Sequence, residues 1–372
     1  MKVVLIKSNL KEALGVVERA SGENLKLPVL KYSNMEAGEE NKIKVTATNL
    51  EVAITFLLLG KVIEKGKVNI PTATVLGMIN NLQSERLNME TRGGQLEIKT
   101  DNYEASTQTI PADDFPIIPK VKNEEDFIEM EGVVLKDGLA QVLAATQFSE
   151  LRTELNSILF DFALDTLKFA GTDSFRLAEK TITSSQFKTN QTQNFRFLLP
   201  LKTAHELSRI LKDDEKVRVY HDQNQALFKT DHWEMISRLT EGNFPEYSSI
   251  IPKTFDSEVL LEREELINAL KLTGVFSSQT SEVKVKSAEG GKAIEINSAS
   301  QDLGENRYVL PAKVKNNFKE VGFNWRYLAD GLRTLKTAEV FLGVNEQDNK
   351  PSLIKSPNEA SFFYILMPIL KT

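Results

Sequence analysis

Apolar residues recur at helical spacing close to the start of each third of the chain. In the first third, Leu10, Leu14 and Val17 share one helix face, while Lys11 and Glu12 lie off it. The same spacing recurs later at Leu135, Leu139, Val142, Leu266 and Leu270. Each of these segments follows a short stretch that is typical of a strand. The pattern therefore predicts a strand followed by an amphipathic helix at the start of each third.

A second helix is predicted further along each third, again after a short strand. Its apolar positions are Val75, Ile79, Leu207, Leu211, Leu328, Leu332 and Leu335. Pro71 and Pro200 stand where two of these helices would begin, a position at which proline is tolerated. Asn9 and Glu12 have the spacing of a capping box, which would start the first helix at Asn9. The plan is strand, helix and more strands, twice in each third of the chain.

Two short stretches repeat at a spacing close to one third of the length. Phe115-Pro116 recurs 129 residues later as Phe244-Pro245, and Ala47-Thr48-Asn49-Leu50-Glu51 recurs 124 residues later as Gly171-Thr172-Asp173-Ser174-Phe175. One third of 372 residues is 124, and a repeat of this length is a whole domain, not a solenoid unit. We therefore expect three similar α+β domains, at 1–121, 127–252 and 256–372, with helices packed on antiparallel sheets.

Composition and charge narrow the function. The chain has 41% hydrophobic residues, 26% charged residues and a formal net charge of −6, which is typical of a globular protein but argues against tight static binding of DNA. Cysteine is absent, which excludes disulfides and thiolate chemistry. The short apolar run at the N-terminus is too short for a signal peptide, and no stretch has the length of a membrane helix. We expect a cytoplasmic protein that does not associate with membranes.

Catalytic motifs are absent from the sequence. It contains neither GxxxxGK[ST] nor GxSxG. Asp113-Asp114 could be a metal-binding carboxylate pair, but the residues directly precede Phe115-Pro116 and fit a solvated turn better. His221-Asp222 could be half of a catalytic dyad, but no nucleophile motif accompanies it. We expect no catalytic residue, no metal site and no cofactor.

Several ordered segments resemble a known family. Gly171-Thr172-Asp173-Ser174-Phe175-Arg176-Leu177-Ala178, Phe244-Pro245-Glu246-Tyr247 and Tyr364-Ile365-Leu366-Met367-Pro368-Ile369-Leu370 are similar to signatures of the bacterial DNA polymerase III beta subunits, the β sliding clamps. The resemblance spans the whole chain in order. It implies a non-catalytic subunit with the DNA-clamp fold, whose head-to-tail homodimer forms a ring around double-stranded DNA. Such a ring gives processivity to the replicative polymerase and grips DNA by topology, which fits an acidic chain.

The resemblance also implies a hydrophobic groove for partner peptides. Its expected occupants are the DNA polymerase III catalytic subunit, the clamp loader, other DNA polymerases and repair proteins. The matching positions are Leu155, Thr172, Ser174, Phe175, Arg176, Leu177, Pro245, Ile250, Ile365, Met367, Pro368 and Ile369. The alternative is that the apolar members are core residues. The sequence departs from the family pattern at Phe175, Ser249 and Leu370, where relatives often carry histidine or tyrosine, arginine, and a cation respectively.

Basic residues on and beside the expected helices are candidates for a DNA-facing surface. They are Lys11, Arg19, Lys26, Lys136, Arg152, Lys202, Arg209, Lys212, Arg333 and Lys336. Each could instead belong to a solvated charge pair. The expected helix at 72–83 has no lysine or arginine, which leaves one weak patch. Phosphate contacts of this kind position the protein without specifying a base sequence.

The resemblance places a dimer interface between the first domain of one copy and the last domain of the other. The matching positions are Ala105, Thr107, Val275 and Phe276. Two alternatives to the clamp remain open: an enzyme with a repeated α+β domain and an unrecognised active site, and a non-replicative DNA scaffold of the same fold.

Overall fold

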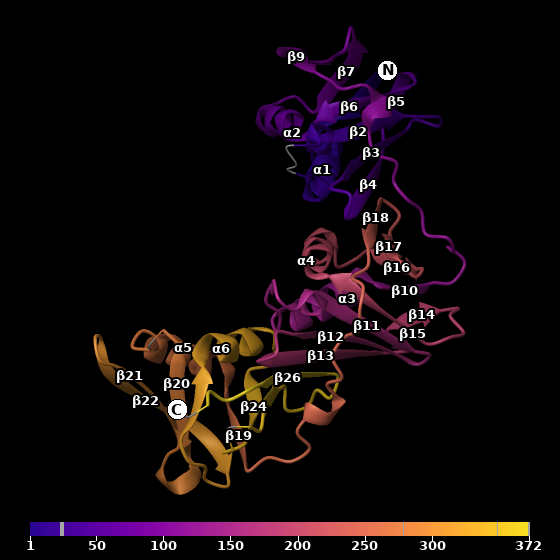
Figure 1. The fold of residues 1–372 in the computed structure, drawn as a ribbon. Helices are drawn as coiled ribbons and strands as arrows, with labels where there is room; N and C mark the ends of the chain where they lie inside the picture. The colour runs from indigo at the N-terminus through magenta and orange to yellow at the C-terminus, as the bar shows by residue number, and fades with distance from the viewer. Residues whose placement is uncertain (23–25, 278, 348, 371–372) are drawn as a thin grey trace. The chain divides into compact units, whose positions relative to one another are not determined.

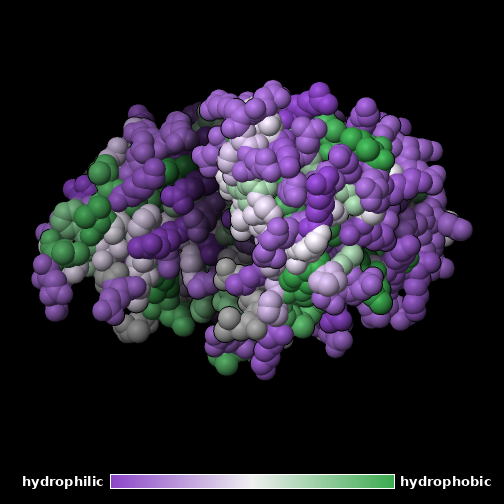
Figure 2. Space-filling view, turned by 90° about the horizontal axis from the view of Figure 1, so that it is seen from above, coloured by the Kyte–Doolittle hydropathy of each residue, from purple (hydrophilic) through white to green (hydrophobic). Residues whose placement is uncertain are grey.

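The structure is a computed structural model, and it describes residues 1–22, 26–277, 279–347 and 349–370. These form two compact units (Figure 1). Unit 1 consists of 1–133, 188–191 and 209–239, and unit 2 of 134–187, 192–208 and 240–372. No helix in the described ranges is long and apolar enough to cross a membrane. Figure 2 shows a mainly hydrophilic surface on which apolar side chains form separate patches.

Unit 1 contains two helices and two antiparallel sheets among its described residues. Its elements are β1 (Lys2–Ile6), α1 (Lys7–Val17), β2 (Tyr32–Ala37), β3 (Lys42–Thr48), β4 (Val52–Leu59), β5 (Lys61–Glu64), β6 (Gly66–Pro71), α2 (Thr72–Asn81), β7 (Arg86–Arg92), β8 (Gln95–Lys99), β9 (Glu104–Gln108), β10 (Ile128–Glu131), β14 (Phe187–Thr189), β16 (Lys216–His221), β17 (Gln225–Lys229) and β18 (Trp233–Arg238). The sheet orders are β5-β1-β7-β8-β9 and β14-β10-β16-β17-β18-β4-β3-β2-β6.

Unit 2 contains one long antiparallel sheet and the remaining described helices. Its elements are α3 (Gly132–Leu143), β11 (Ser157–Ala163), β12 (Thr166–Thr172), β13 (Arg176–Thr183), β15 (Phe195–Pro200), α4 (Leu201–Ile210), β19 (Ser257–Glu262), α5 (Arg263–Gly274), β20 (Glu282–Ser287), β21 (Ala293–Ser300), β22 (Gly304–Lys315), β23 (Val321–Asn324), α6 (Trp325–Arg333), β24 (Glu339–Val344), β25 (Ser352–Lys355) and β26 (Phe362–Leu366). The order is β15-β11-β12-β13-β26-β25-β24-β19-β22-β21-β20-β23.

The predicted strand–helix pairs are present. β1, β10 and β19 lead directly into α1, α3 and α5, and β6, β15 and β23 lead into α2, α4 and α6. The predicted apolar face of α1 is its buried face, with Leu10, Leu14 and Val17 in the core of the unit.

The predicted start of α1 is wrong. The helix begins at Lys7, and Ile6 occupies the N-cap position without a side-chain cap. The backbone N–H of Lys7 donates to the carbonyl of Glu85 at 2.7 Å, and the Ser8 N–H donates to the Glu85 carboxylate at 3.4 Å. A neighbouring segment therefore satisfies two of the free N–H groups at the helix start, in place of a capping box at Asn9.

The repeated Thr48 and Thr172 segments form the same turn. The hydroxyl of Thr48 donates to the Val52 carbonyl at 2.9 Å, and that of Thr172 donates to the Arg176 carbonyl at 2.6 Å. Two residues after each threonine, Leu50 and Ser174 have φ of +77° and +79°. Left-handed backbone is rare outside glycine and asparagine, so its recurrence at matching positions indicates a copied structure.

A matching strand junction follows each of these turns. β4 pairs with β18 in unit 1, and β13 pairs with β26 in unit 2. The facing residues are Val52–Ser237, Ala53–Ile236 and Ile54–Met235 in the first junction, and Arg176–Leu366, Leu177–Ile365 and Ala178–Tyr364 in the second. Corresponding residues of β4 and β13 are 124 positions apart in the sequence, and those of β18 and β26 are 129 positions apart. The two junctions therefore have the same register.

Candidate functional site

The β13·β26 junction has an apolar core on one side. Leu177, Leu353 and Ile365 form a buried cluster, and Tyr247 and Ile251 pack against it. Leu177 and Ile365 are thus core residues, which is the alternative left open by the sequence. Leu155, at the end of a short 3₁₀ turn (Thr153–Leu155), is also buried. Leu155, Leu177 and Ile365 can therefore support a binding surface, but they do not form its exposed part.

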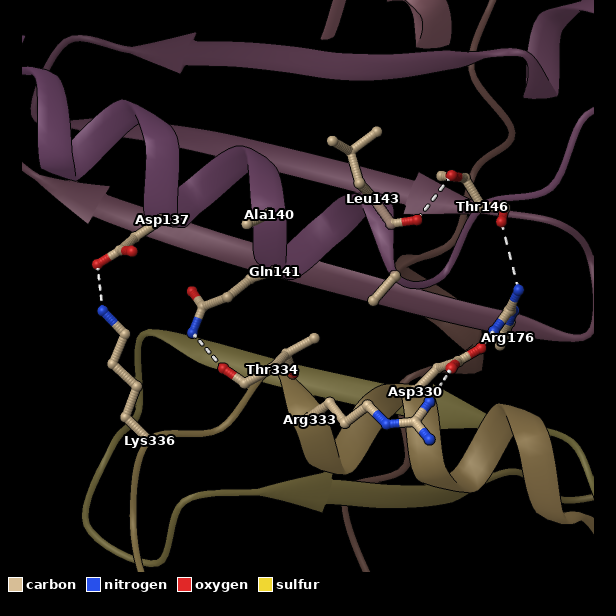
Figure 3. Close-up of a pocket in the computed structure, with 11 residues that line it drawn as sticks. Asp137, Ala140, Gln141, Leu143, Thr146, Arg176, Asp330, Arg333, Thr334 and Lys336 are labelled. Carbon is tan, nitrogen blue, oxygen red and sulfur yellow. Dashed lines mark hydrogen bonds and ion pairs between the residues drawn. The ribbon is translucent and has the colours of Figure 1, made fainter. Parts of the chain in front are cut away.

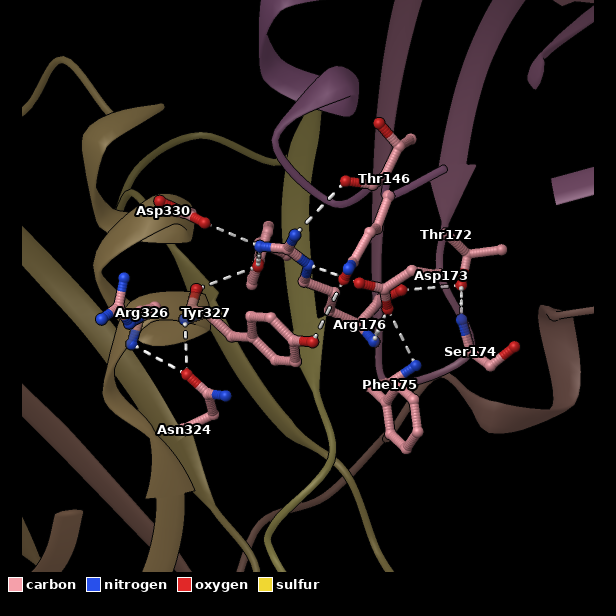
Figure 4. A network of polar contacts seen from close by, with 12 residues as sticks. Thr146, Thr172, Asp173, Ser174, Phe175, Arg176, Asn324, Arg326, Tyr327 and Asp330 are labelled. Atoms are coloured by element: carbon pink, nitrogen blue, oxygen red, sulfur yellow. Dashed lines mark hydrogen bonds and ion pairs between the residues drawn. The ribbon is translucent and has the colours of Figure 1, made fainter. Parts of the chain in front are cut away.

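A buried arginine lies at the start of β13. The Arg176 guanidinium donates from Nε to the Asp173 carboxylate at 2.8 Å and from Nη1 to the Asp330 carboxylate, also at 2.8 Å (Figure 4). Asp173 belongs to the turn before β13, whereas Asp330 is on α6. The arginine therefore joins the turn of one repeat to a helix of the next through charge-assisted hydrogen bonds, which are stronger than neutral ones.

Three further groups surround the same guanidinium. It lies 4.1 Å from the centroid of the Tyr327 ring, and its Nη2 donates to the carbonyl of Thr146 at 3.3 Å. Its Nη1 also donates to the Tyr364 hydroxyl at 3.4 Å, and that hydroxyl donates to the Tyr327 carbonyl at 2.9 Å. We call Arg176, Asp173, Asp330, Tyr327 and Tyr364 the Arg176 cluster.

The surroundings of the Arg176 cluster fix its charges. Burial acts to lower the pKa of Arg176, but its contacts with Tyr364, Asp173 and Asp330 outweigh burial, and the pKa lies above its ordinary value. Burial raises the pKa of Tyr364, against the opposing effect of Arg176. The arginine therefore stays charged and the tyrosine stays protonated at physiological pH, so the cluster provides rigid positioning and not proton transfer.

An exposed apolar surface begins beside the Arg176 cluster. The Phe175 side chain is 62% exposed and points away from the cluster in Figure 4. The Met367 N–H donates to the Phe175 carbonyl at 2.8 Å, which fixes the C-terminal segment along the turn. The Arg152 guanidinium donates to the Ser174 hydroxyl at 2.8 Å from the other side. The turn thus lies between the C-terminal segment and the 149–155 loop.

The structure brings most of the predicted groove residues to this region. Thr172, Ser174, Phe175, Arg176 and Leu177 lie on the turn and β13, and Ile365 and Met367 lie opposite. Among the others, Pro368 is buried, Pro245, Met367 and Ile369 are half-buried, and Ile250 and Leu370 are exposed. Pro245 and Ile250 flank Tyr247, which packs on the Leu177–Ile365 cluster.

Sequence reasoning missed the partners of Arg176. Asp330 and Tyr364 lie 154 and 188 residues further along the chain, and no local motif links them to Arg176. The alternation Phe362-Phe363-Tyr364-Ile365-Leu366 does place Tyr364 on the same strand face as Phe362. A polar ring on that face was the one available signal for a buried hydrogen bond.

Family models match the chain along almost its whole length. They are the N-terminal domain of the DNA polymerase III beta subunit at 1–119, its central domain at 129–246 and its C-terminal domain at 248–370. The chain belongs to the DNA polymerase III beta subunit family. Beta sliding clamps of Synechococcus elongatus and Vibrio cholerae are 26% and 27% identical, over 99% of this chain and 99% and 100% of those proteins.

Solved sliding clamps have the same fold. The structure from Bacillus subtilis superposes with a TM-score of 0.93 at 22% identity, and that from Thermotoga maritima with 0.90 at 23% identity. A clamp from Pseudomonas aeruginosa bound to griselimycin gives 0.93 at 21%. Each comparison covers 100% of both chains. Beta subunits are non-catalytic processivity subunits of DNA polymerase III, which confirms the expectation of a binding protein acting with DNA and a polymerase.

The residues expected to face DNA in this beta subunit lie on its surface. All are exposed except Lys136, which is half-buried. Several already have carboxylate partners: Lys212 bonds to Glu12, Arg333 to Asp330 at 2.9 Å, Lys336 to Asp137 at 2.5 Å, and Arg152 to Glu154 at 3.2 Å. The charge-pair alternative therefore applies to these four. α2 has no lysine or arginine, as the sequence shows.

The expected dimer positions occur on two separate elements. Ala105 and Thr107 are half-buried on β9, at one edge of its five-stranded sheet. Val275 is 65% exposed and Phe276 is half-buried, directly after α5.

Within the described ranges, no group of three or more histidine, aspartate and glutamate side chains could hold a metal ion.

Proposed function

We propose that this beta subunit closes head to tail with a second copy into a ring around double-stranded DNA, and that it holds DNA polymerase III there without reading base sequence. The observation that carries the proposal is the repeated strand junction. Two copies of it are present within the chain, and pairing of two open strand edges from different copies of the chain would supply a third.

We further propose that the three repeats are domains at 1–121, 127–252 and 256–372. In support, β4·β18 joins a strand of the first segment to one of the second, and β13·β26 joins the second to the third. The family models divide the chain at similar places. The boundary between unit 1 and unit 2 runs through the middle segment, because its two sheets each continue into a neighbouring domain.

The two open edges that would pair are on β22 and β9, among several sheet edges in the described chain. Along Gly304–Pro311, β22 pairs with β21, and on its other side β19 pairs only with Ala312–Lys315. In the described chain, β9 ends its sheet beyond β8. Open edges invite pairing with another chain. Pairing β22 of one copy with β9 of the next would remove both edges and, after two such contacts, close a ring.

The internal repeats give the register of that contact. Thr55 on β4 faces Glu234 on β18. Arg307 on β22 corresponds to Thr55. Three residues after each of them stands a leucine, and that leucine faces a buried isoleucine on the neighbouring strand. Glu104 corresponds to Glu234, because each faces the lysine before the turn, Lys99 or Lys229. The register therefore places Glu104 of one copy opposite Arg307 of the other, an attractive pair across strands.

Val275 and Phe276 fit the same interface. The Asn306 side chain of β22 donates to the Leu272 carbonyl at 3.0 Å, and the Ser298 hydroxyl of β21 donates to the Thr273 carbonyl. The end of α5 is thus fixed beside the open part of β22. An exposed valine there would be buried when a second copy pairs with the edge.

We propose that the surface around Phe175 is the peptide groove for the polymerase III catalytic subunit, the clamp loader, other DNA polymerases and repair proteins. Exposed Phe175, Ile250 and Leu370 and half-buried Met367 provide apolar contact, and methionine suits a surface with several partners. The groove comprises the twelve positions expected from the sequence, with Leu155, Leu177 and Ile365 beneath it. The griselimycin-bound Pseudomonas aeruginosa clamp supports ligand binding to this fold.

We propose that the ten basic residues face DNA in the ring and that the protein works in the cytoplasm. The carboxylate partners of Lys212, Arg333 and Lys336 weaken their contacts with phosphate, because DNA must compete for them. Loose contact of this kind leaves retention to ring topology and permits sliding.

Retention on closed and cut DNA tests this proposal. After loading by a clamp loader, the protein should stay on nicked circular DNA through gel filtration and be lost when the circle is linearised. Equal retention on both forms would show direct binding without a ring. Failure of the loaded protein to retain purified polymerase III catalytic subunit would favour a non-replicative scaffold instead.

A paired substitution tests the groove. Phe175→Ser should weaken capture of the polymerase III catalytic subunit by about tenfold or more, because loss of a buried aromatic anchor has that order of effect. Leu50→Ser, on the matching turn of the first repeat, is the control and should leave capture unchanged. Equal capture by the wild type and Phe175→Ser would place the groove elsewhere.

A further inference from the structure

The charged side chains that line the cavity between α3 and α6 are paired with one another. Lys336 bonds to Asp137 at 2.5 Å and Arg333 to Asp330 at 2.9 Å (Figure 3). Arg176, in the same lining, also bonds to Asp330. An anionic ligand would have to displace these carboxylates, which makes this cavity a poor site for one.

A different cavity of unit 2 combines an apolar centre with unpaired lysines. It has a volume of about 350 Å³ and is lined by residues of β19, β22 and β24. Leu260 and Phe341 in its lining face each other across β19 and β24, and both are half-buried. Lys292 and Lys313 also line it, and neither has a carboxylate partner within the described ranges. The cavity therefore suits a ligand that is partly apolar and partly anionic.

The apolar centre belongs to a row of side chains that occurs in each repeat. A row starts three residues before the first helix of the repeat and continues through the facing residues on the next two strands. Facing residues on antiparallel strands share one side of the sheet. The rows are Val4, Asn88 and Lys99 before α1; Glu129, Arg218 and Lys229 before α3; and Leu260, Phe341 and Lys355 before α5. All three rows end in a lysine, which supports the correspondence.

The charges of the first two rows are neutralised by carboxylates. Arg218 bonds to Glu129 at 2.6 Å, and Lys229 bonds to Glu124 at 2.9 Å. Lys99 has two carboxylate partners, at 2.9 and 3.0 Å. These two rows are therefore complete as surface ion pairs.

The third row is apolar in the middle and has lysines at its ends. Leu260 and Phe341 stand where the second row has its ion pair. Lys355 lies 5.3 Å from the centroid of the Phe341 ring, and no carboxylate of the described chain bonds to it. On the other side, Lys313 of β22 faces Leu260. The third row thus runs lysine, leucine, phenylalanine, lysine across four strands, which is a specialisation of a copied surface.

We propose that this row docks an acidic segment of a partner protein, with one apolar side chain of the segment over Leu260 and Phe341 and carboxylates on Lys313 and Lys355. Neighbouring strands are about 4.7–4.9 Å apart, so the two lysines start about 14 Å apart. In an extended segment, the residues two before and two after an anchor are about 13 Å apart and point to the same side as the anchor. Acidic residues at these two positions would therefore reach both lysines.

The surroundings of the row favour a peptide over a nucleic acid. The Phe341 and Phe255 rings pack with centroids 5.6 Å apart, and Lys355 also lies over Phe341. This ring is therefore covered by two side chains instead of being free to stack on a base. Glu258, the acidic residue in the cavity lining, is bonded to Lys315 at 3.1 Å, which offsets its repulsion of an acidic ligand. Docking here requires neither ring closure nor the surface at Phe175.

Titration calorimetry on the unloaded full-length protein tests the proposal with the peptide acetyl-Asp-Ser-Phe-Ser-Asp-amide. The peptide should bind saturably, with a dissociation constant below about 1 mM. Alanine in place of its phenylalanine should weaken binding at least about tenfold, because the anchor is lost. The isomer acetyl-Ser-Asp-Phe-Asp-Ser-amide, whose carboxylates point away from the lysines, should bind about fivefold more weakly.

The main variant copies the second row into the third. Leu260→Glu/Phe341→Arg keeps the net charge, installs the ion pair of the second row, and should weaken binding of the peptide at least about tenfold. The second repeat shows that an arginine fits such a position, because the Arg218 guanidinium lies 5.2 Å from the centroid of the Phe127 ring. Circular dichroism checks that the variant folds.

A second variant leaves the apolar centre unchanged. Lys313→Gln/Lys355→Gln should weaken binding about fivefold, because two exposed ion pairs with the peptide are lost. Its control is Lys271→Gln/Lys350→Gln, which makes the same change in net charge at two other exposed lysines and should bind the peptide as the wild type does.

Four results would overturn the proposal. They are a lack of saturable binding at millimolar peptide, equal binding by the wild type and Leu260→Glu/Phe341→Arg, an equal loss in the lysine control, and a loss in Phe175→Ser, which would place the peptide in the groove. A single-stranded oligothymidylate that binds more tightly than the peptide and is lost in Leu260→Glu/Phe341→Arg would make the row a DNA contact and would also contradict it. Because no DNA is loaded in the peptide titrations, their outcome is independent of the circular-DNA test.

Discussion

The two strand junctions share a copied backbone arrangement and differ in the side chains at the start of their first strand. β4·β18 and β13·β26 have the same register and begin after the same threonine turn. Where the first junction has Val52, the second has Arg176. The first is closed by an apolar cluster of Ala53, Ile236 and their neighbours. The second has an apolar cluster too, but it adds a buried cation with two carboxylates and two tyrosines.

The difference shows which parts of the repeat are structural and which are specialised. Pairing and apolar burial occur in both junctions, so they are what joins the repeats. The Arg176 cluster occurs only in the second junction, beside the exposed surface at Phe175. A buried ion network contributes little net stability but fixes geometry. We infer that it positions the turn that carries Phe175.

The largest expected effect is common to both junctions. Ile236→Ala and Ile365→Ala each remove a buried side chain from the pairing strand, and each should lower the free energy of unfolding by about 3 kcal/mol. Urea unfolding followed by hydrogen exchange should locate the loss in unit 1 for the first and unit 2 for the second. A cost at only one junction would mean that the two are not equivalent.

The next effect distinguishes the junctions. Arg176→Met should cost about 3 kcal/mol, because it leaves the buried Asp173 carboxylate without its cationic partner. Val52→Ala at the matching position should cost about 1–2 kcal/mol from lost burial alone. Both values come from urea midpoints. Similar costs for the two variants would contradict the ionic role assigned to Arg176.

A smaller change removes one bond of the Arg176 cluster. Tyr364→Phe keeps the buried ring but deletes the hydroxyl that bonds to Tyr327 and Arg176, and it should cost about 1 kcal/mol. The matching variant at the first junction, Met235→Leu, changes no polar bond and should have a smaller effect on thermal unfolding. A neutral Tyr364→Phe would show that the ring alone holds the strand.

The smallest effect concerns pH and unit 1. Burial lowers the pKa of His221 below its ordinary 6.5, against the raising effect of Asp222. The stability that the neutral imidazole contributes is complete above pH 6.5 and is lost as pH falls through the folded-state pKa, because the unfolded chain takes up the proton first. Hydrogen exchange in β16 and β17 should rise between pH 7 and 5 relative to β13, and His221→Gln should reduce that rise.

Most of the fold that the sequence predicts follows from local patterns. The helix faces, the strand–helix pairs and the copied turn follow from spacing within a few residues, and the copies support one another. The exposed part of the candidate site, around Phe175, is also predicted, through resemblance. The Arg176 cluster is not, because Asp330 and Tyr364 approach only after two repeats pair. The start of α1 differs because Glu85, a distant residue, replaces the local cap.

The third junction is expected to form between two copies of the chain, in the same register as the two junctions within the chain. The chain has no cysteine, so Glu104→Cys/Arg307→Cys introduces the only thiols. A disulfide needs Cβ atoms about 3.5–4.5 Å apart. Facing residues on paired strands have Cβ atoms about 4.5–5.5 Å apart, which borders that range, whereas diagonal residues are about 7–8 Å apart and lie outside it.

Mild oxidation should give a covalent dimer of twice 41.8 kDa on a non-reducing gel, and the shifted pair Glu104→Cys/Val309→Cys should give much less. Covalent dimers that form equally with the shifted pair, or a chain that stays monomeric with both, would contradict the copied junction.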